Sequence, residues 1–276
     1  LTYITQPGEY SAGQAGAESG GYEFVNPPLV HVEDAGHNLD PSFTGSLSLV
    51  LYPLYDTTAG VMSTGSLSGV ASVSAVGGVG NWNASALTID RLGTYIMGVS
   101  VLALPRLYPF LATNSSLLYV TAGPPYELVF TVEPADSTAS DGKGTQLPNQ
   151  PILTVLDRGG NVASATQHQK LVVIELVQVS IGEVSNSPGT LSYEFFAKMP
   201  SSGVADFSEA TFSINNDGKY YLQATVSGTD VPAKNSRLVT VADAKNCADE
   251  TSASGCNNQT YCEYVSNACV CYPGFV

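Results

Sequence analysis

The sequence predicts an all-β protein in which two tandem β-sandwiches are followed by a small disulfide-rich module. Short runs of alternating apolar and polar residues, separated by Gly, Pro, Asn and Asp, are typical of half-buried antiparallel strands. The first half of the chain repeats in the second half, and all five cysteines lie between residues 247 and 271. The predicted domains are therefore residues 1–123, 124–243 and 244–276.

The internal repeat is clearest in the segments PLVHVEDAGHN and PILTVLDRGGN, which lie 123 positions apart. Trp82 and Tyr95 match Phe207 and Tyr220 at a distance of 125 positions, so one short insertion separates the two copies. About seven strands in about 100 residues fit a two-sheet sandwich. The positions that match in the two segments are Pro28, Leu29, Val30, Val32, Asp34, Gly36 and Asn38 with Pro151, Ile152, Leu153, Val155, Asp157, Gly159 and Asn161.

Individual strands and turns follow from this pattern. We expect DAGHN and DRGGN to form tight turns, since Asp caps a turn and Gly or Asn accepts a positive φ. Tyr95 and Tyr220 each follow a Gly turn on a late strand, where a tyrosine can hydrogen-bond across the corner of a sandwich. In the second copy we expect strands at residues 127–132, 152–157, 170–179, 191–196, 204–207, 211–214, 220–226 and 237–241.

The order LVFTVEP, PILTVLDRGGN, GVADF, FSINNDGKYYLQATV and LVTV resembles the tandem immunoglobulin-like or filamin-like repeats of large surface and adhesin proteins. The resemblance covers residues 1–243 and implies two immunoglobulin-like β-sandwiches that act as spacers in a long stalk. The fold alone specifies no activity, because the sandwich hosts many functions.

The cysteine tail has eight, five, six and one residues between successive cysteines, followed by Tyr-Pro-Gly-Phe. A zinc knuckle is the alternative, but C-x-x-C pairs and histidines are missing from the tail. The spacing resembles an EGF-like module, which implies an oxidising compartment. It also implies that Cys247 pairs with Cys262, that Cys256 pairs with Cys269, and that Cys271 pairs with a cysteine beyond Val276, so we expect this module to be incomplete. Lys245 and Asn246 depart from the calcium-binding variant, so calcium is not expected.

Composition and charge exclude several classes of function. Lys and Arg total 10 against 24 Asp and Glu, a net charge of −14, which disfavours nucleic acid as a partner. The longest uncharged stretch is rich in Gly and Ser, so no membrane span is expected. His31, Asp34 and His37 could be metal ligands, but the second copy keeps only the Asp, which favours turn capping. No catalytic motif is present, so we predict a non-enzyme without cofactor or metal.

The candidate sites are therefore surface features. Asn83, Asn114 and Asn258 begin N-glycosylation sequons, so N-linked glycans are predicted there. The loop 102–116 carries Tyr108 and Phe110 where the second copy has a shorter segment, which makes these two aromatic residues the candidate interface.

These observations favour a structural segment of a large extracellular or cell-surface protein, in which stiff tandem domains build a stalk or filament. A mastigoneme-type flagellar hair is a specific form of this hypothesis, because such algal proteins look similar in combining these modules. The expected partners are other copies of the chain or neighbouring extracellular proteins, since an uncharged, Tyr-rich surface suits lateral contacts. The alternative is an adhesin or receptor ectodomain that binds glycan or protein through sandwich loops.

Overall fold

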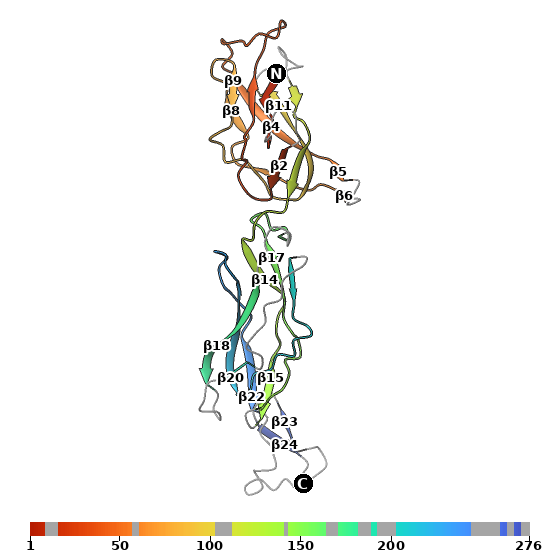
Figure 1. Ribbon diagram of the computed structural model, residues 1–276, viewed down its shortest axis with the longest axis vertical. Helices are drawn as coiled ribbons and strands as arrows, with labels where there is room; N and C mark the ends of the chain where they lie inside the picture. Colours follow the sequence, from red (N-terminus) through yellow and green to blue (C-terminus); the bar gives the residue numbers. More distant parts are fainter. Residues whose placement is uncertain are drawn as a thin grey trace. The chain divides into compact units, whose positions relative to one another are not determined.

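The computed structural model describes residues 1–8, 16–56, 61–102, 112–140, 143–163, 171–181, 189–191 and 203–243, together with the backbone of residues 260–263 and 268–271. Every regular element in this part of the chain is a β-strand (Figure 1). No helix that could cross a membrane occurs among these residues. The predicted all-β class is therefore confirmed for the part of the chain that the structure describes.

The first repeat forms two main sheets. The smaller one has the order β1-β3-β9, and the larger one has the order β2-β13-β11-β4-β8, with β12 also pairing with β11. The short pairs β5–β6 and β7–β10 complete the repeat. The bounds are β1 Thr2–Thr5, β2 Gly16–Ser19, β3 Leu29–His31, β4 Ser46–Pro53, β5 Tyr55–Asp56, β6 Val61–Met62, β7 Leu67–Ser68, β8 Ser72–Ser74, β9 Val79–Asn81, β10 Thr88–Ile89, β11 Gly93–Val101, β12 Ala112–Asn114 and β13 Leu118–Thr121.

The second repeat builds the same pair of sheets. The smaller one is β14-β17-β19, and the larger one is β16-β15-β22-β20-β18, with β21 pairing with β20 as β12 pairs with β11. The bounds are β14 Glu127–Val132, β15 Ser137–Ser140, β16 Lys143–Gly144, β17 Ile152–Leu156, β18 Val172–Ile181, β19 Val204–Asp206, β20 Gly218–Val226, β21 Lys234–Asn235 and β22 Val239–Asp243, and the tail adds β23 Thr260–Glu263 and β24 Ala268–Cys271. Strands were expected near β14, β17, β18, β19, β20 and β22, whereas β15, β16 and β21 were not predicted.

The chain divides into two compact units whose limits differ from those of the sequence repeats. Unit 1 comprises Leu1–Glu127 and Val155–His168, and unit 2 comprises Leu128–Thr154 and Gln169–Val276. Unit 1 thus includes a short segment of the second repeat. The three domain ranges inferred from the sequence remain predictions.

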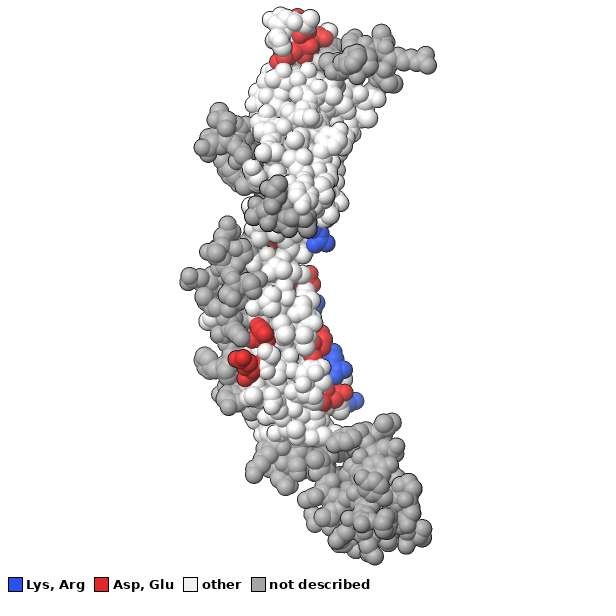
Figure 2. Space-filling view, turned by 90° about the vertical axis from the view of Figure 1, so that its right-hand side faces the viewer, with Lys and Arg blue, Asp and Glu red and all other residues white. Residues whose placement is uncertain are grey.

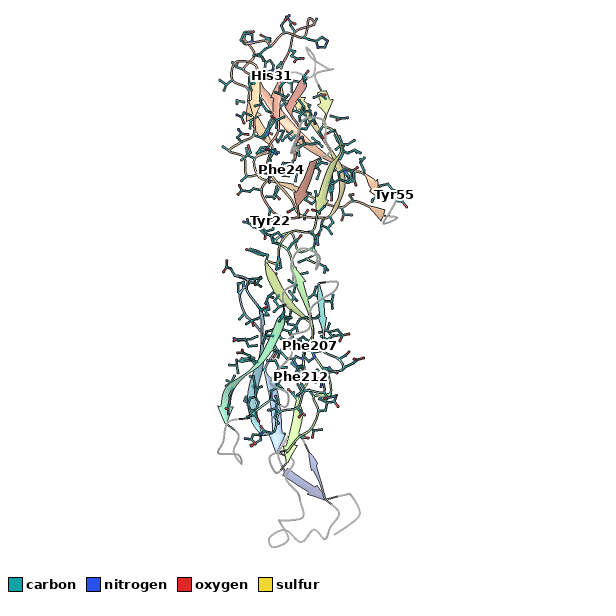
Figure 3. The ribbon with its side chains drawn as sticks, in the orientation of Figure 1. Tyr22, Phe24, His31, Tyr55, Phe207 and Phe212 are labelled. Atoms are coloured by element: carbon teal, nitrogen blue, oxygen red, sulfur yellow. The ribbon has the colours of Figure 1, made fainter. Side chains whose placement is uncertain are left out.

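Each repeat buries an apolar core that draws on both of its sheets. In the first repeat Val30 of β3, in the smaller sheet, packs in one cluster with Leu47 and Met97 of the larger sheet, around the fully buried Trp82. In the second repeat Phe207, the counterpart of Trp82, lies 5.8 Å from Phe212 between ring centroids (Figure 3). Burial of such side chains contributes about 25 cal/mol per Å² of apolar surface, which makes these layers the main source of stability.

Both repeats contain the predicted tyrosine corner. The buried Tyr95 donates its hydroxyl proton to the carbonyl oxygens four and three residues earlier, at 3.0 and 3.3 Å, and accepts a hydrogen bond from the Gly65 backbone N–H. Tyr220 makes the same two contacts at 3.1 and 3.0 Å. Burial is the main factor that raises the pKa of both hydroxyls. The two hydroxyls therefore stay protonated donors at neutral pH.

A buried serine repeats with the same bonds. Ser115 Oγ accepts from the Met97 N–H at 2.9 Å and donates to the carbonyl of the next residue at 2.7 Å. Ser236 accepts from the Leu222 N–H at 3.0 Å and again donates to the following carbonyl at 2.7 Å. The two repeats therefore share hydrogen-bond networks as well as sequence positions.

We predict that Tyr95→Phe lowers the free energy of unfolding of unit 1 by about 1–3 kcal/mol, because the Arg91 and Leu92 carbonyls lose their donor and the Gly65 N–H loses its acceptor. Trp82 is the only tryptophan and is fully buried in unit 1, so its fluorescence during denaturant unfolding measures this change. Tyr119→Phe is the control, since Tyr119 is exposed. Equal effects of the two substitutions would contradict the assignment.

Candidate functional site

The loop of residues 34–38 (loop 34–38) is a turn closed by Asp34. Asp34 Oδ1 accepts from the backbone N–H of Gly36 at 2.8 Å and of Asn38 at 3.0 Å, and from Asn38 Nδ2 at 3.2 Å. The Asn38 backbone bond, the Asn38 side chain and the Gly36 N–H together hold the pKa of Asp34 below its usual value. The prediction that this Asp caps a turn therefore agrees with the hydrogen bonds.

The histidines beside this loop are not brought together with Asp34 as ligands. His31 lies half-buried on β3 (Figure 3), and the side chain of His37 is 90% exposed at a positive φ of 62°. His37 Nδ1 lies 3.6 Å from Glu33. Within the described residues no group of three His, Cys, Asp or Glu side chains could hold a metal ion.

One face of the larger sheet of unit 1 is exposed and uncharged. Inward and outward residues alternate along β4 and β11, which leaves Val50 and Tyr52 of β4, Ile96 of β11 and Tyr119 of β13 on the outer side; we call these four residues the tyrosine face. Tyr52 is 48% exposed and lies opposite Ile96 in the strand register. The tyrosine face thus combines apolar area with phenol groups, as interface cores do.

The surroundings of the tyrosine face are polar but uncharged. Ser48 and Ser72 lie opposite each other beside it and share a hydrogen bond of 3.1 Å. Gly98 lies beneath the ring of Tyr52, where a Cβ would collide with that ring. In the side view of Figure 2 the described surface of unit 1, the upper half, carries few charged side chains. Little charge would have to be desolvated if a partner covered such a surface.

Two of the three predicted glycosylation residues are exposed. Asn83 lies in the turn after β9, and Asn114 is the last residue of β12. Asn114 is paired with Gly98 of β11, which places it on the side of the sheet that carries the tyrosine face. Asn258 lies outside the described residues. Glycosylation at these residues remains a prediction.

The cysteine tail is described only as a hairpin of backbone, in which Cys262 of β23 lies opposite Cys269 of β24. Cys247 and Cys256 lie outside the described residues, as do the side chains of the hairpin that includes Cys271. The disulfide pairing therefore remains a prediction. The candidate interface residues Tyr108 and Phe110 also lie outside the described residues.

Sequence reasoning missed the tyrosine face, although the signal was present. The segment SLSLVLY places Leu47 and Leu49 on one side of a strand, so Val50 and Tyr52 continue the row on the other side with Ser48. An uncharged row of this kind on the outer face of a sheet is the sequence signal that predicts the tyrosine face. Loop 102–116 stands out in the sequence instead, through Tyr108 and Phe110 and through its greater length than the matching segment of the second copy.

Comparisons with known proteins give structural likenesses only. No family model matches the chain. No curated protein matches it. A β-glucuronidase from Parabacteroides merdae is 10% identical, with 87% of this chain aligned to 25% of that chain and a TM-score of 0.25. This chain thus spans a quarter of that enzyme.

Two further solved structures are aligned over most of their length. The N-terminal Ig1-2 module of the Drosophila receptor protein tyrosine phosphatase DLAR is 10% identical, with 88% of this chain and 97% of that chain aligned and a TM-score of 0.21. The fibronectin(III)-like modules of Clostridium thermocellum CbhA are 8% identical, with 89% and 96% aligned and a TM-score of 0.23. Superpositions this loose add nothing to the strand pairing and cores described above.

We predict that Asn83 and Asn114 carry N-linked glycans when the chain is secreted from a eukaryotic cell, because both side chains are exposed. Asn83→Gln and Asn114→Gln should each remove the mass of one glycan from the intact protein. Asn81→Gln is the matched control, because Asn81 is exposed but begins no sequon. An unchanged mass after either sequon substitution would contradict the prediction at that residue.

Proposed function

We propose that the chain is a non-enzymatic structural segment of an extracellular protein, in which immunoglobulin-like repeats and an EGF-like module form part of a stalk or filament that bears tension. The duplicated networks, the cysteine spacing and the sequons support this proposal. The observation that carries it is the position of the last strand in each repeat.

In both repeats the last strand pairs in parallel with a strand near the start of the repeat. In the first repeat β13 pairs with β2 from Leu118↔Gly16 to Thr121↔Ser19, and in the second β22 pairs with β15 from Val241↔Ser137 to Asp243↔Ala139. Tension applied through the two ends of a repeat pulls such neighbouring strands in opposite directions along their axes. All the evenly spaced hydrogen bonds between them are then loaded together, so the pair resists separation by shear.

Side chains reinforce the same junction. Gln6 Oε1 accepts from the Ser116 N–H at 2.9 Å, two residues before β13 begins. In the second repeat Glu133 Oε2 accepts from the Arg237 N–H at 2.9 Å, and Asp136 Oδ1 accepts from the Thr240 N–H of β22 at 2.9 Å. Each repeat therefore ties its beginning to its end with both backbone and side-chain bonds.

We predict that proline in β2 lowers the force at which unit 1 unfolds when the 276-residue chain is stretched by its ends in a single-molecule experiment. In an edge strand only every second residue donates a backbone hydrogen bond to the neighbouring strand, so only one of Ala17→Pro and Glu18→Pro removes such a bond. Both variants are made, and the one that lowers the unfolding free energy more is used. The lost hydrogen bonds belong to the sheared pair, so the force of one of the main unfolding events should fall.

The matched control is proline in β8, the opposite edge strand of the same sheet, as Val73→Pro or Ser74→Pro. Denaturant unfolding followed by Trp82 fluorescence identifies a β2 variant and a β8 variant that lose equal free energy of unfolding. The β8 variant should keep the unfolding force of the original chain. Equal forces for the two variants would refute the load-bearing role of the β2–β13 pair.

The tyrosine face favours a second role, which is lateral contact between copies of the chain in a filament. Tyr52→Lys should lower the association measured by sedimentation at increasing protein concentration, because a charge there would be desolvated in the contact. Val76→Lys is the control, since Val76 is 79% exposed in the turn between β8 and β9. A monomer at every concentration would exclude this contact and leave the adhesin alternative.

A further inference from the structure

Two loops of the chain have the same internal structure. In the loop of residues 157–161 (loop 157–161) Asp157 Oδ1 accepts from the backbone N–H of Gly159 at 2.9 Å and of Asn161 at 2.8 Å, and from Asn161 Nδ2 at 3.0 Å. These are the bonds of loop 34–38, 123 positions earlier. The backbone bonds 34 N–H to 38 O and 157 N–H to 161 O are both 2.8 Å long. The loops therefore differ little in shape.

Asp157 and Asn161, the two ends of loop 157–161, are buried within unit 1. Asp157 is only 1% exposed and Asn161 only 8%. Asp157 Oδ2 accepts from the Gly123 N–H at 3.0 Å, and Asn161 Nδ2 donates to the Asp90 carbonyl at 2.7 Å. Asn161 Oδ1 accepts from the Leu92 N–H at 3.3 Å. These three side-chain bonds thus end on backbone of the first repeat, and the Arg91 guanidinium of the same repeat donates to the Gly160 carbonyl at 3.4 Å.

The surface that receives loop 157–161 is shaped by glycine. A Cβ at Gly20 would collide with Asn161 Nδ2 and Asp157 Oδ2, and a Cβ at Gly21 would collide with the backbone of Gly159. We call the residues Gly20, Gly21, Asp90, Leu92 and Gly123 the glycine socket. The ring of Tyr22 beside it lies 6.0 Å from the Arg158 guanidinium (Figure 3). Loop 157–161 fits against the glycine socket because Gly20 and Gly21 have no β-carbon.

Loop 34–38 presents the same atoms to solvent. Asp34, Gly36 and Asn38 are all exposed, whereas their counterparts in loop 157–161 are buried or half-buried. Asp34 Oδ2 contacts Asn38 Nδ2 at 3.3 Å, and it corresponds to the oxygen with which Asp157 binds Gly123. His37 and Gly160 occupy the same positive-φ position, at 62° and 78°.

We infer that loop 34–38 is a docking element for the end of another sandwich domain of this kind, joined ahead of Leu1, whose glycine socket would hold it as unit 1 holds loop 157–161. A second copy of this chain does not offer that site, because loop 157–161 already fills its glycine socket. In the second repeat, strand pairing puts Ala139 at the position of Gly20, so the glycine that the socket requires is not repeated there. The inference is independent of the load-bearing role, since docking requires no tension.

The test uses a fusion in which residues 1–127 precede the full 276-residue chain. Leu128 is the repeat counterpart of Leu1, so this junction keeps the natural linker. In the fusion, loop 34–38 of the full chain meets the glycine socket of the added copy. Hydrogen exchange at the Gly36 and Asn38 amides of that loop should slow by about tenfold or more relative to the unfused chain.

The control is the same fusion with Gly20→Val in the added copy, which fills the socket with a side chain. Exchange in loop 34–38 should return to the rate of the unfused chain. Unchanged exchange in the first fusion would overturn the inference. Slow exchange in both fusions would also overturn it, because the protection would then come from general crowding.

A second measurement uses the chain without any fusion. Asp157→Ala should speed exchange at the Gly123 and Leu92 amides of the socket by about tenfold. Asp34→Ala, which removes the same internal bonds from the exposed loop, should leave both amides unchanged. If Asp157→Ala has no effect on either amide, the glycine socket does not hold its loop and the inference fails.

Discussion

The last strand of each repeat pairs with another strand on each side, and the larger sheet and the glycine socket depend on these two pairings. β13 lies between β11 and β2, as β22 lies between β20 and β15. The antiparallel bonds to β11 align the strand that carries the tyrosine corner, and the parallel bonds to β2 bring the beginning of the repeat to its end. Gly123 of the glycine socket follows β13 by two residues, so the same pairing positions the socket.

The repeats diverged mainly at their surfaces. The tyrosine corner, the buried serine and the tie to the last strand are present twice with nearly equal bond lengths. The tyrosines and serines are buried, and a buried polar group that loses its partner costs about 1–3 kcal/mol. A substitution on the exposed face of the larger sheet leaves no buried polar group without a partner. Tyr52 in the first repeat could therefore be acquired without altering the network beneath it.

The sequence predicts some elements of this structure well and others not at all. Alternation in ELVFTV predicts β14 with its observed limits, and the Asp and Gly positions predict both loops, because these signals are local. β2 and β15 are poor in large β-branched and aromatic residues, and each pairs with a strand about 100 positions away, so no local signal reveals them. The segment 211–214 contributes only single bridges, at Ser213 and Ile214, rather than the strand that its apolar residues suggest.

The glycine socket lies beyond sequence reasoning for a similar reason. Gly20 serves by leaving space for a side chain 141 positions later, and only the folded structure shows which side chain that is. By contrast, the tyrosine face follows from alternation once the inward side of β4 is known. Tertiary contacts between distant segments therefore set the limit of prediction here.

The polar character of loop 34–38 explains how such an element can be both exposed and specific. Its internal bonds satisfy Asp34 in solvent, so the loop keeps its shape without a partner and little ordering entropy is lost on docking. An apolar patch in this position would invite unspecific association. A carboxylate, however, is costly to bury unless donors meet it, as the Gly123 N–H meets Asp157. A surface that lacks this donor leaves the Asp34 carboxylate buried without a partner, and a surface that lacks the glycines collides with the loop. Asp34, which is hydrated in the free loop, therefore makes docking specific.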